Sequence, residues 1–238
     1  FKRMPKLPES TKKRLEFKDG DFVDLDIYDC DSISEHSDTV LLLHGLEGSS
    51  ESHYIAGLAR ALLNEGRSVI VKHFRGCSCE SNRLLRSYLS GVSDDLEETL
   101  EQLKTQGIEI DFVCGFSLGG NVLLKWLGEN PNTNKVKAAV AVSVPLSLSE
   151  CAKSINQGFS KLYQKHLLDS LKEKTKSKFP EISETIRITP AQVDQISNFE
   201  EFDELVTARL NGFEGAGDYY QRVSSRQFLG QIRVPTLI

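Results

Sequence analysis

The pentapeptide at positions 115–119, Gly-Phe-Ser-Leu-Gly, constrains the fold of this chain more than any other feature. It follows an apolar run at 110–114, and a helix-forming stretch at 119–127 comes directly after it. A G-x-S-x-G motif between a strand and a helix predicts a tight, strained turn that projects the serine from the edge of a sheet. The start of the helix adds a field that favours a developing anion. Ser117 is therefore the predicted nucleophile. The competing interpretation is a turn of small residues that merely lets a helix pack on a strand.

A second motif, His44-Gly45-Leu46-Glu47-Gly48, stands at the end of an earlier apolar run at 39–43. Acyl transfer produces an oxyanion, and each backbone N–H aimed at it lowers the barrier by about 3 kcal/mol. We expect one N–H from Leu118, the residue after the nucleophile, and the other from Leu46. His44 is interpreted as a structural histidine that hydrogen-bonds this loop.

The order of predicted elements indicates an α/β-hydrolase fold, with a mostly parallel sheet and helices on both of its faces. Two short runs joined by Asp19-Gly20 predict an antiparallel hairpin, because glycine accepts the positive φ of such turns. After the hairpin, strands and helices alternate. The predicted strands are 13–17, 22–28, 39–43, 68–74, 110–115 and 136–144, and the predicted helices are 53–65, 93–106 (capped by Ser93) and 119–127.

The alternation stops after the strand at 136–144, which divides the chain into three parts. Residues 1–145 are the predicted first part of the hydrolase core. Residues 146–217 are a predicted helical cap insertion over the sheet, although a separate helical domain is the alternative. Residues 218–238 return to the core with a helix at 218–228 and a strand that begins at Thr236. The apolar face of the cap consists of Phe159, Leu162, Tyr163, Leu167 and Leu171.

The catalytic partners of Ser117 are expected outside the sequence. In this fold the triad runs along the chain as serine, then Asp or Glu, then His. His166 follows Ser117 but lies in the predicted cap and precedes its nearest acid, and His53 and His73 precede the serine. The chain begins without Met and ends on a half-built strand, so we expect a fragment. The acid and the histidine are then expected beyond Ile238, and the fragment alone is expected to be inactive.

Composition excludes several functional classes. A formal net charge of -5 and a pI near 5.6 argue against nucleic-acid binding, which needs a basic surface. The lysines at 172, 174, 176 and 178 alternate with polar residues and predict a solvated helix face. No run approaches the roughly 20 apolar residues of a membrane span. The sequence does not determine an oligomeric state.

The cysteines predict a reducing, cytoplasmic location. An odd number without regular spacing does not describe a disulfide framework. The C-x-C pair at 77–79 lacks a second pair for a tetrahedral zinc site, so we expect no metal, and the proposed chemistry needs no cofactor. The cysteines are Cys30, Cys77, Cys79, Cys114 and Cys151.

Several segments together resemble the YheT-like family of α/β-hydrolases, over nearly the whole chain. They are H-F-R-G-C-S at 73–78 with Glu80, Asn82 and Arg83, and the runs 44–48, 115–121, 202–209, 218–220 and 235–238. The resemblance implies a carboxylesterase for short- to medium-chain acyl esters or phospholipids, hence a role in lipid metabolism, with Ser117 as the charge-relay nucleophile. It also implies an Asp soon after the strand that begins at Thr236, then a His. The loop at 73–78 is interpreted as fixing the cap through Arg75 and a carboxylate.

The predicted function is therefore hydrolysis of a small-molecule ester through an acyl-enzyme. Phe116, Leu118 and Phe159 are candidates for the lining of an acyl pocket. Two alternatives are acyl transfer to an alcohol and a ligand-binding hydrolase fold without catalysis.

Overall fold

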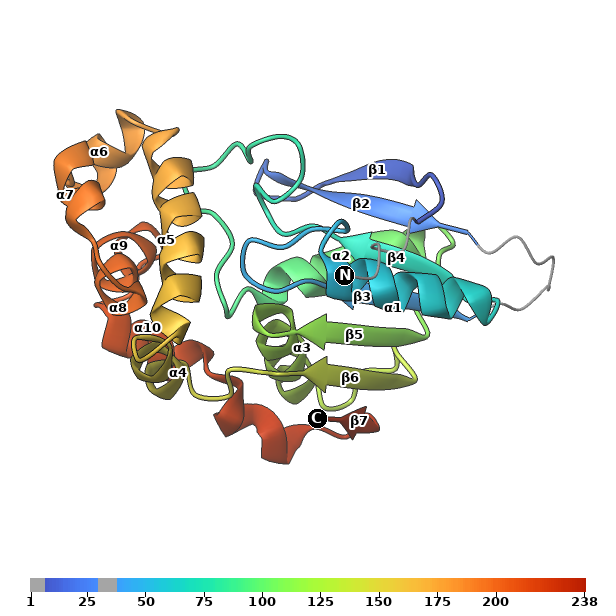
Figure 1. The fold of residues 1–238 in the computed structure, drawn as a ribbon. Coiled ribbons are helices and arrows are strands. Elements are labelled where there is room, and N and C mark those ends of the chain that lie inside the picture. Colours follow the sequence, from blue (N-terminus) through green and yellow to red (C-terminus); the bar gives the residue numbers. More distant parts are fainter. Residues whose placement is uncertain (1–6, 30–37) are drawn as a thin grey trace.

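The sheet in Figure 1 is mostly parallel and confirms the predicted α/β-hydrolase architecture. The computed structural model describes residues 7–29 and 38–238. The strand order is β1-β2-β4-β3-β5-β6-β7, with antiparallel pairing at β1-β2 and β2-β4 and parallel pairing elsewhere. The strands are β1 (Thr11–Glu16), β2 (Phe22–Tyr28), β3 (Thr39–Leu43), β4 (Ser68–Lys72), β5 (Phe112–Phe116), β6 (Ala138–Val142) and β7 (Thr236–Leu237).

The first two strands form the predicted hairpin. Thr11 pairs with Ile27 and Glu16 with Phe22, and Gly20 takes a φ of +87° in the turn between them. That conformation is accessible to glycine without steric cost, so the Asp19-Gly20 signal correctly located the turn.

The parallel strands are buried on both faces, which explains their continuous apolar runs. Successive side chains of a strand point to opposite sides of the sheet. Leu41 and Leu43 of β3 therefore pack with helices α2 and α3, whereas Val40 and Leu42 pack with α1. The helices of the core are α1 (His53–Asn64), α2 (Ser93–Thr105) and α3 (Leu118–Glu129).

The start of α2 differs from the prediction. Ser93 is the first helical residue and Val92 is the N-cap. The Ser93 hydroxyl donates to Glu129 at the end of α3, at 2.6 Å, and accepts from Lys125 at 2.9 Å. Ser93 therefore lies one position after the N-cap, and its side chain connects α2 to α3.

A group of helices lies beyond the carboxyl ends of β5 and β6 in Figure 1. Leu168, Val193 and Phe202, with further apolar residues, form a small hydrophobic core within this group. A pocket lies between these helices and the sheet. Its lining, described below, includes Leu46, Tyr88 and Tyr220. The elements are α4 (Leu148–Ile155), α5 (Ser160–Lys176), α6 (Glu181–Ile186), α7 (Pro190–Gln195), α8 (Phe199–Phe202), the π-helix η1 (Asp203–Thr207), α9 (Ala208–Leu210) and α10 (Ala216–Val223).

The helix predicted at 218–228 is divided in two. Helix α10 ends at Val223, and a 3₁₀ helix, η2 (Ser225–Gln231), follows it. Ser224 between them is extended, with φ −63° and ψ 127°. Its hydroxyl donates to the Tyr220 carbonyl at 2.6 Å and accepts from the Leu148 N–H at 3.0 Å. Ser224 thus separates the two helices, and its hydroxyl connects the end of α10 to the start of α4.

Arg75 fixes a different part of the chain from the one predicted. Its guanidinium is buried and binds Asp95 of α2 with two hydrogen bonds, at 2.7 and 2.8 Å. It also donates to Asp19 at 2.7 Å and Asp21 at 3.0 Å in the hairpin turn. The predicted carboxylate partner is therefore present, but in the core and not in the cap. Arg75 connects the hairpin to α2.

Among the described residues, no helix is long and apolar enough to cross a bilayer. Cys77, Cys79, Cys114 and Cys151 are free thiols, and Cys30 lies outside the described residues.

Candidate active site

Ser117 occupies a strained turn between β5 and α3. Its φ of 50° and ψ of −116° lie in a region that residues other than glycine rarely adopt, and such strain is concentrated at functional sites. The Ser117 N–H donates to the Val142 carbonyl of β6 at 2.8 Å, and its carbonyl accepts from the Asn121 N–H at 3.0 Å. The residue is exposed, so its hydroxyl is accessible. The sheet and α3 thus hold the turn in place from both sides.

The glycines around Ser117 are required by close backbone contact. A Cβ on Gly115 would lie 2.5 Å from the Gly119 carbonyl oxygen. A Cβ on Gly119 would lie 2.6 Å from the His44 carbonyl oxygen and 2.7 Å from that of Leu43. Contacts this short are with backbone atoms, which cannot move aside. Glycine at both outer positions of the G-x-S-x-G motif therefore allows α3 to start directly against β3 and β5.

The loop that follows β3 lies against Ser117. A Cβ on Gly45 would lie 3.3 Å from the Ser117 Cβ, and Leu46 lines the same pocket as Ser117 and Leu118. The Gly45 N–H donates to the Tyr54 hydroxyl at 3.0 Å, which fixes the loop to α1. Within residues 7–29 and 38–238, the N–H groups of Leu46 and Leu118 donate no hydrogen bond to another residue. Both predicted oxyanion donors thus belong to residues of the pocket that holds Ser117.

His44 is a structural group. It is fully buried, its Nδ1 bonds the Gly45 carbonyl at 2.7 Å, and its Nε2 accepts from the Phe74 N–H at 3.2 Å. Burial lowers the pKa of His44 to about 3, because desolvation disfavours the charged ring. A neutral ring with both nitrogens engaged connects the loops that follow β3 and β4.

The other histidines are also engaged elsewhere or exposed. His73 is buried and its Nε2 lies 3.2 Å from Asp26. His53 and His166 are exposed, at the start of α1 and within α5. In the described part of the chain, no side chain hydrogen-bonds the Ser117 hydroxyl, and no group of three or more His, Cys, Asp or Glu residues could hold a metal ion.

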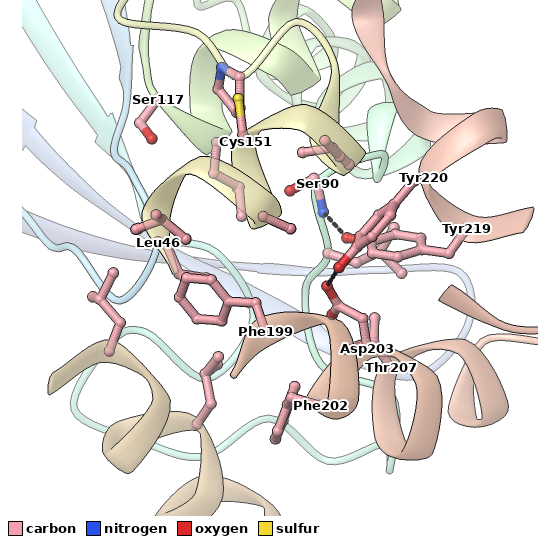
Figure 2. Close-up of a pocket in the computed structure, with 18 of the residues that line it drawn as sticks. Leu46, Ser90, Ser117, Cys151, Phe199, Phe202, Asp203, Thr207, Tyr219 and Tyr220 are labelled. Carbon is pink, nitrogen blue, oxygen red and sulfur yellow. Dashed lines mark hydrogen bonds between the residues drawn. The ribbon is translucent and has the colours of Figure 1, made fainter. Parts of the chain in front are cut away.

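A pocket of about 180 Å³ opens at Ser117 (Figure 2). Its lining is mainly apolar and comes both from the sheet side and from the helices beyond the strand ends. The residues are Leu46, Ser87, Tyr88, Leu89, Ser90, Ser117, Leu118, Pro145, Leu148, Cys151, Ala152, Ile155, Tyr163, Leu167, Leu171, Phe199, Phe202, Asp203, Thr207, Tyr219 and Tyr220.

The structure places two predicted pocket residues outside this lining. Phe116 ends β5 on the face that packs with α1, and its ring lies 4.9 Å from that of Tyr54. Phe159 precedes α5 and is 93% exposed. Leu118 does line the pocket, and so do Tyr163, Leu167 and Leu171 of α5, whereas Leu162 is 70% exposed. The predicted apolar face of α5 is thus divided between pocket and solvent.

Two of the four lysines near the end of α5 are not solvated as predicted. Lys174 donates to Glu47 at 2.8 Å and lies 3.4 Å from the Cys77 sulfur. Lys178 donates to Asn82 at 2.7 Å. Lys172 and Lys176 instead bond Asp194 near the surface. Since Glu47 directly follows Leu46, Lys174 connects α5 to the loop beside Ser117.

The pocket also contains a polar cluster that the sequence did not predict. The Tyr220 hydroxyl donates to Asp203 at 2.7 Å, and the Tyr219 hydroxyl accepts from the Ser90 N–H at 3.0 Å. Burial raises the pKa of Asp203 from 3.8 to about 6, and hydrogen bonds from Tyr220 and Thr207 partly offset that rise. The runs 202–209 and 218–220 carried the family resemblance, but nothing in them indicated that they meet in the pocket.

The strand order, the serine turn between β5 and α3, and a pocket at the carboxyl ends of the strands define an α/β-hydrolase. The family model described as the alpha/beta hydrolase fold matches residues 38–238. The solved structure of the Pyrococcus furiosus esterase Pf2001 aligns with a TM-score of 0.51 and 24% identity, over 61% of this chain and 56% of that one. This likeness shows a common fold.

Proteins of similar sequence indicate which family of α/β-hydrolases the chain belongs to. The Escherichia coli protein YheT, which is named as an esterase, is 40% identical over 95% of this chain and 67% of its own length. An abhydrolase domain-containing protein of Dictyostelium discoideum is 27% identical over 99% of this chain and 61% of its own. Phospholipase ABHD3 of Homo sapiens is 26% identical over 92% of this chain and 55% of its own. The chain belongs to the α/β-hydrolase superfamily and, within it, to the YheT-like family.

Proposed function

We propose that the protein is a serine esterase that hydrolyses short- to medium-chain carboxylic esters through an acyl-enzyme. The observation that carries the proposal is Ser117, held at a φ of 50° between β5 and α3 and open to an apolar pocket. Relatives that are named as an esterase and a phospholipase support an ester substrate. A pocket of about 180 Å³ with a mainly apolar lining supports a short or medium acyl chain.

In the proposed first step, the Ser117 Oγ forms a bond to the ester carbonyl carbon while its proton passes to a histidine base. The carbonyl oxygen becomes an oxyanion that accepts from the N–H groups of Leu46 and Leu118. The carbon–oxygen bond to the alcohol then breaks, and the base returns the proton to the departing alcohol. Water repeats the sequence on the acyl-enzyme and releases the acid.

We propose that the acid and the base of the triad come from residues that follow Ile238. Their order after the nucleophile is that of the fold. The positions of His44 and His73 support the proposal, because each ring is buried in a structural contact with another group. We also propose that residues 146–217 act as a cap over the site. Lining contributed by Leu148, Tyr163 and Phe202 supports this role.

The test is hydrolysis of p-nitrophenyl esters with acyl chains of two to sixteen carbons by the full-length protein. We expect the highest kcat/KM for short and medium chains, and a loss of about a thousandfold or more in Ser117→Ala. Ethanol in the same assay separates hydrolysis from transfer, because an ethyl ester product would indicate an acyltransferase. Activity that survives Ser117→Ala would overturn the proposal.

A further inference from the structure

One carboxylate lies in the pocket where an apolar acyl site has no need of it. Asp203 is the one formally charged side chain among the described residues that line the cavity. It starts the π-helix η1, and its neighbours in the lining include Phe199, Phe202 and Thr207. Figure 2 shows Asp203 and Ser117 on different sides of the pocket, with the carboxylate turned toward Tyr220.

Asp203 has hydrogen-bond partners but no cationic partner in the described part of the chain. Its Oδ2 accepts from the Tyr220 hydroxyl at 2.7 Å, and Thr207 supplies a second hydrogen bond. No lysine, arginine or histidine of residues 7–29 and 38–238 forms an ion pair with it. A carboxylate has about four lone-pair positions. Asp203 therefore keeps acceptor capacity for a group that enters the pocket.

A half-buried carboxylate without a counter-charge costs folding free energy, and proteins place such groups where a ligand or a reaction uses them. A role limited to connecting η1 to α10 would not need a charge, since the neutral amide oxygen of an asparagine also accepts from a tyrosine hydroxyl. The π-helix points the same way, because single π-turns occur frequently at functional sites. The rings of Phe199, Phe202 and Tyr219 line the same pocket, and aromatic faces attract a cationic group.

We propose that Asp203 binds a hydrogen-bond-donating group of the ester substrate, an ammonium or a hydroxyl, at the end of the pocket away from Ser117. The inference rests on the proposed esterase function and adds a substrate class to it. The preferred ester is apolar near the scissile bond and carries a donor at one end. Asp203 is then a specificity-determining residue that takes no part in the acyl transfer itself.

Two series of hexanoate esters test the proposal with the full-length protein. In one series the acyl chain ends in methyl, hydroxyl or ammonium, with p-nitrophenol as the leaving group. In the other series the acyl chain is constant, and the alcohol is an alkanol, an alkanediol or an aminoalkanol of equal length. We expect a donor-bearing member of at least one series to be preferred about ten- to a hundredfold in kcat/KM, the range of a charge-assisted hydrogen bond. The two donors distinguish an ammonium from a hydroxyl ligand.

Three variants separate this role from a structural one. Asp203→Asn keeps an acceptor for Tyr220 but removes the charge. It should abolish a preference for an ammonium and reduce a preference for a hydroxyl about tenfold, while the methyl ester is still hydrolysed. Tyr220→Phe removes the link to α10, leaves the charge in place, and should keep most of the preference. Glu200→Gln removes an exposed carboxylate of α8 that does not line the pocket, and should behave as wild type.

A fluorophosphonate probe keeps the two proposals distinguishable. If Asp203→Asn is labelled at Ser117 at the wild-type rate and melts at or above the wild-type temperature, its fold and nucleophile are intact. A preference as large as that of wild type in this intact variant, or the absence of any preference in both wild-type series, overturns the Asp203 inference alone. Failure of wild-type labelling at Ser117 would overturn the esterase proposal instead.

Discussion

The close contact between α3 and β3 makes Gly119→Ala a severe substitution. The added Cβ would lie 2.6 and 2.7 Å from the carbonyl oxygens of His44 and Leu43, and 2.8 Å from the Leu43 Cβ. Real Cβ atoms do not approach other heavy atoms this closely, so β3 or α3 must move. Overpacking of this kind costs about 3 kcal/mol when the neighbours are backbone.

A matched control is present in α1. Gly57 is in the middle of that helix, and a Cβ there would meet nothing within 4 Å. Alanine is a better helix former than glycine by about 0.8 kcal/mol, so Gly57→Ala should stabilise the protein. The same chemical change therefore has opposite signs at two positions of one chain.

Thermal and urea unfolding measure both variants. For a chain of this size, Gly119→Ala should lower Tm by about 6–12 °C and Gly57→Ala should raise it by about 2 °C. Gly119→Ala should also slow labelling of Ser117, because the turn and the Leu46 loop share the displaced contact. A Gly119→Ala protein as stable and as reactive as wild type would refute the inference that the close contact of Gly119 with β3 holds the Ser117 turn in place.

Three further substitutions test buried polar groups. The folded pKa of Asp203, about 6, lies above its unfolded value of about 3.9, so its ionisation destabilises the fold progressively between pH 4 and pH 6. Asp203→Asn should therefore stabilise the protein by up to about 3 kcal/mol at pH 8 and by less than about 1 kcal/mol at pH 4 in urea titrations, and equal effects at both pH values would refute the assignment. Arg75→Met leaves buried carboxylates without their cation and should cost about 3–5 kcal/mol, whereas Lys165→Met on the exposed face of α5 should change Tm little. Asn121→Leu removes hydrogen bonds to three backbone groups in the loop at 90 and at 223–225, and should cost at least about 3 kcal/mol by the same measurement.

The core of the fold could be predicted because its signals are local. Continuous apolar runs identified β3 and β5, and the Asp19-Gly20 turn identified the hairpin. The strained turn at Ser117 could be predicted for the same reason, since its strand, glycines and helix are contiguous in the sequence. Where two backbone segments approach closely, the sequence contains glycine, and these glycines can be recognised without knowing which residues they contact.

The pocket could not be predicted because it is assembled from distant segments. Asp203 meets Tyr220 across 17 positions, and Ser90 meets Tyr219 across 129. Phe159 has the apolar side chain expected of a pocket residue, but it lies in solvent. Its place in the sequence does not show which side of the helical segment is covered by neighbouring elements. Arg75 was correctly matched to carboxylates, yet their location in the hairpin turn and α2 depended on tertiary contacts.

Covalent labelling of the folded, full-length protein by a fluorophosphonate, mapped by mass spectrometry, tests the central claim most directly. We predict one adduct, on the peptide that contains Ser117, and no adduct in Ser117→Ala or after heat denaturation. Ser87→Ala, which alters another serine of the same pocket, should be labelled as wild type is. An adduct that persists in Ser117→Ala, or no adduct on the folded protein, would contradict the assignment of Ser117 as the nucleophile.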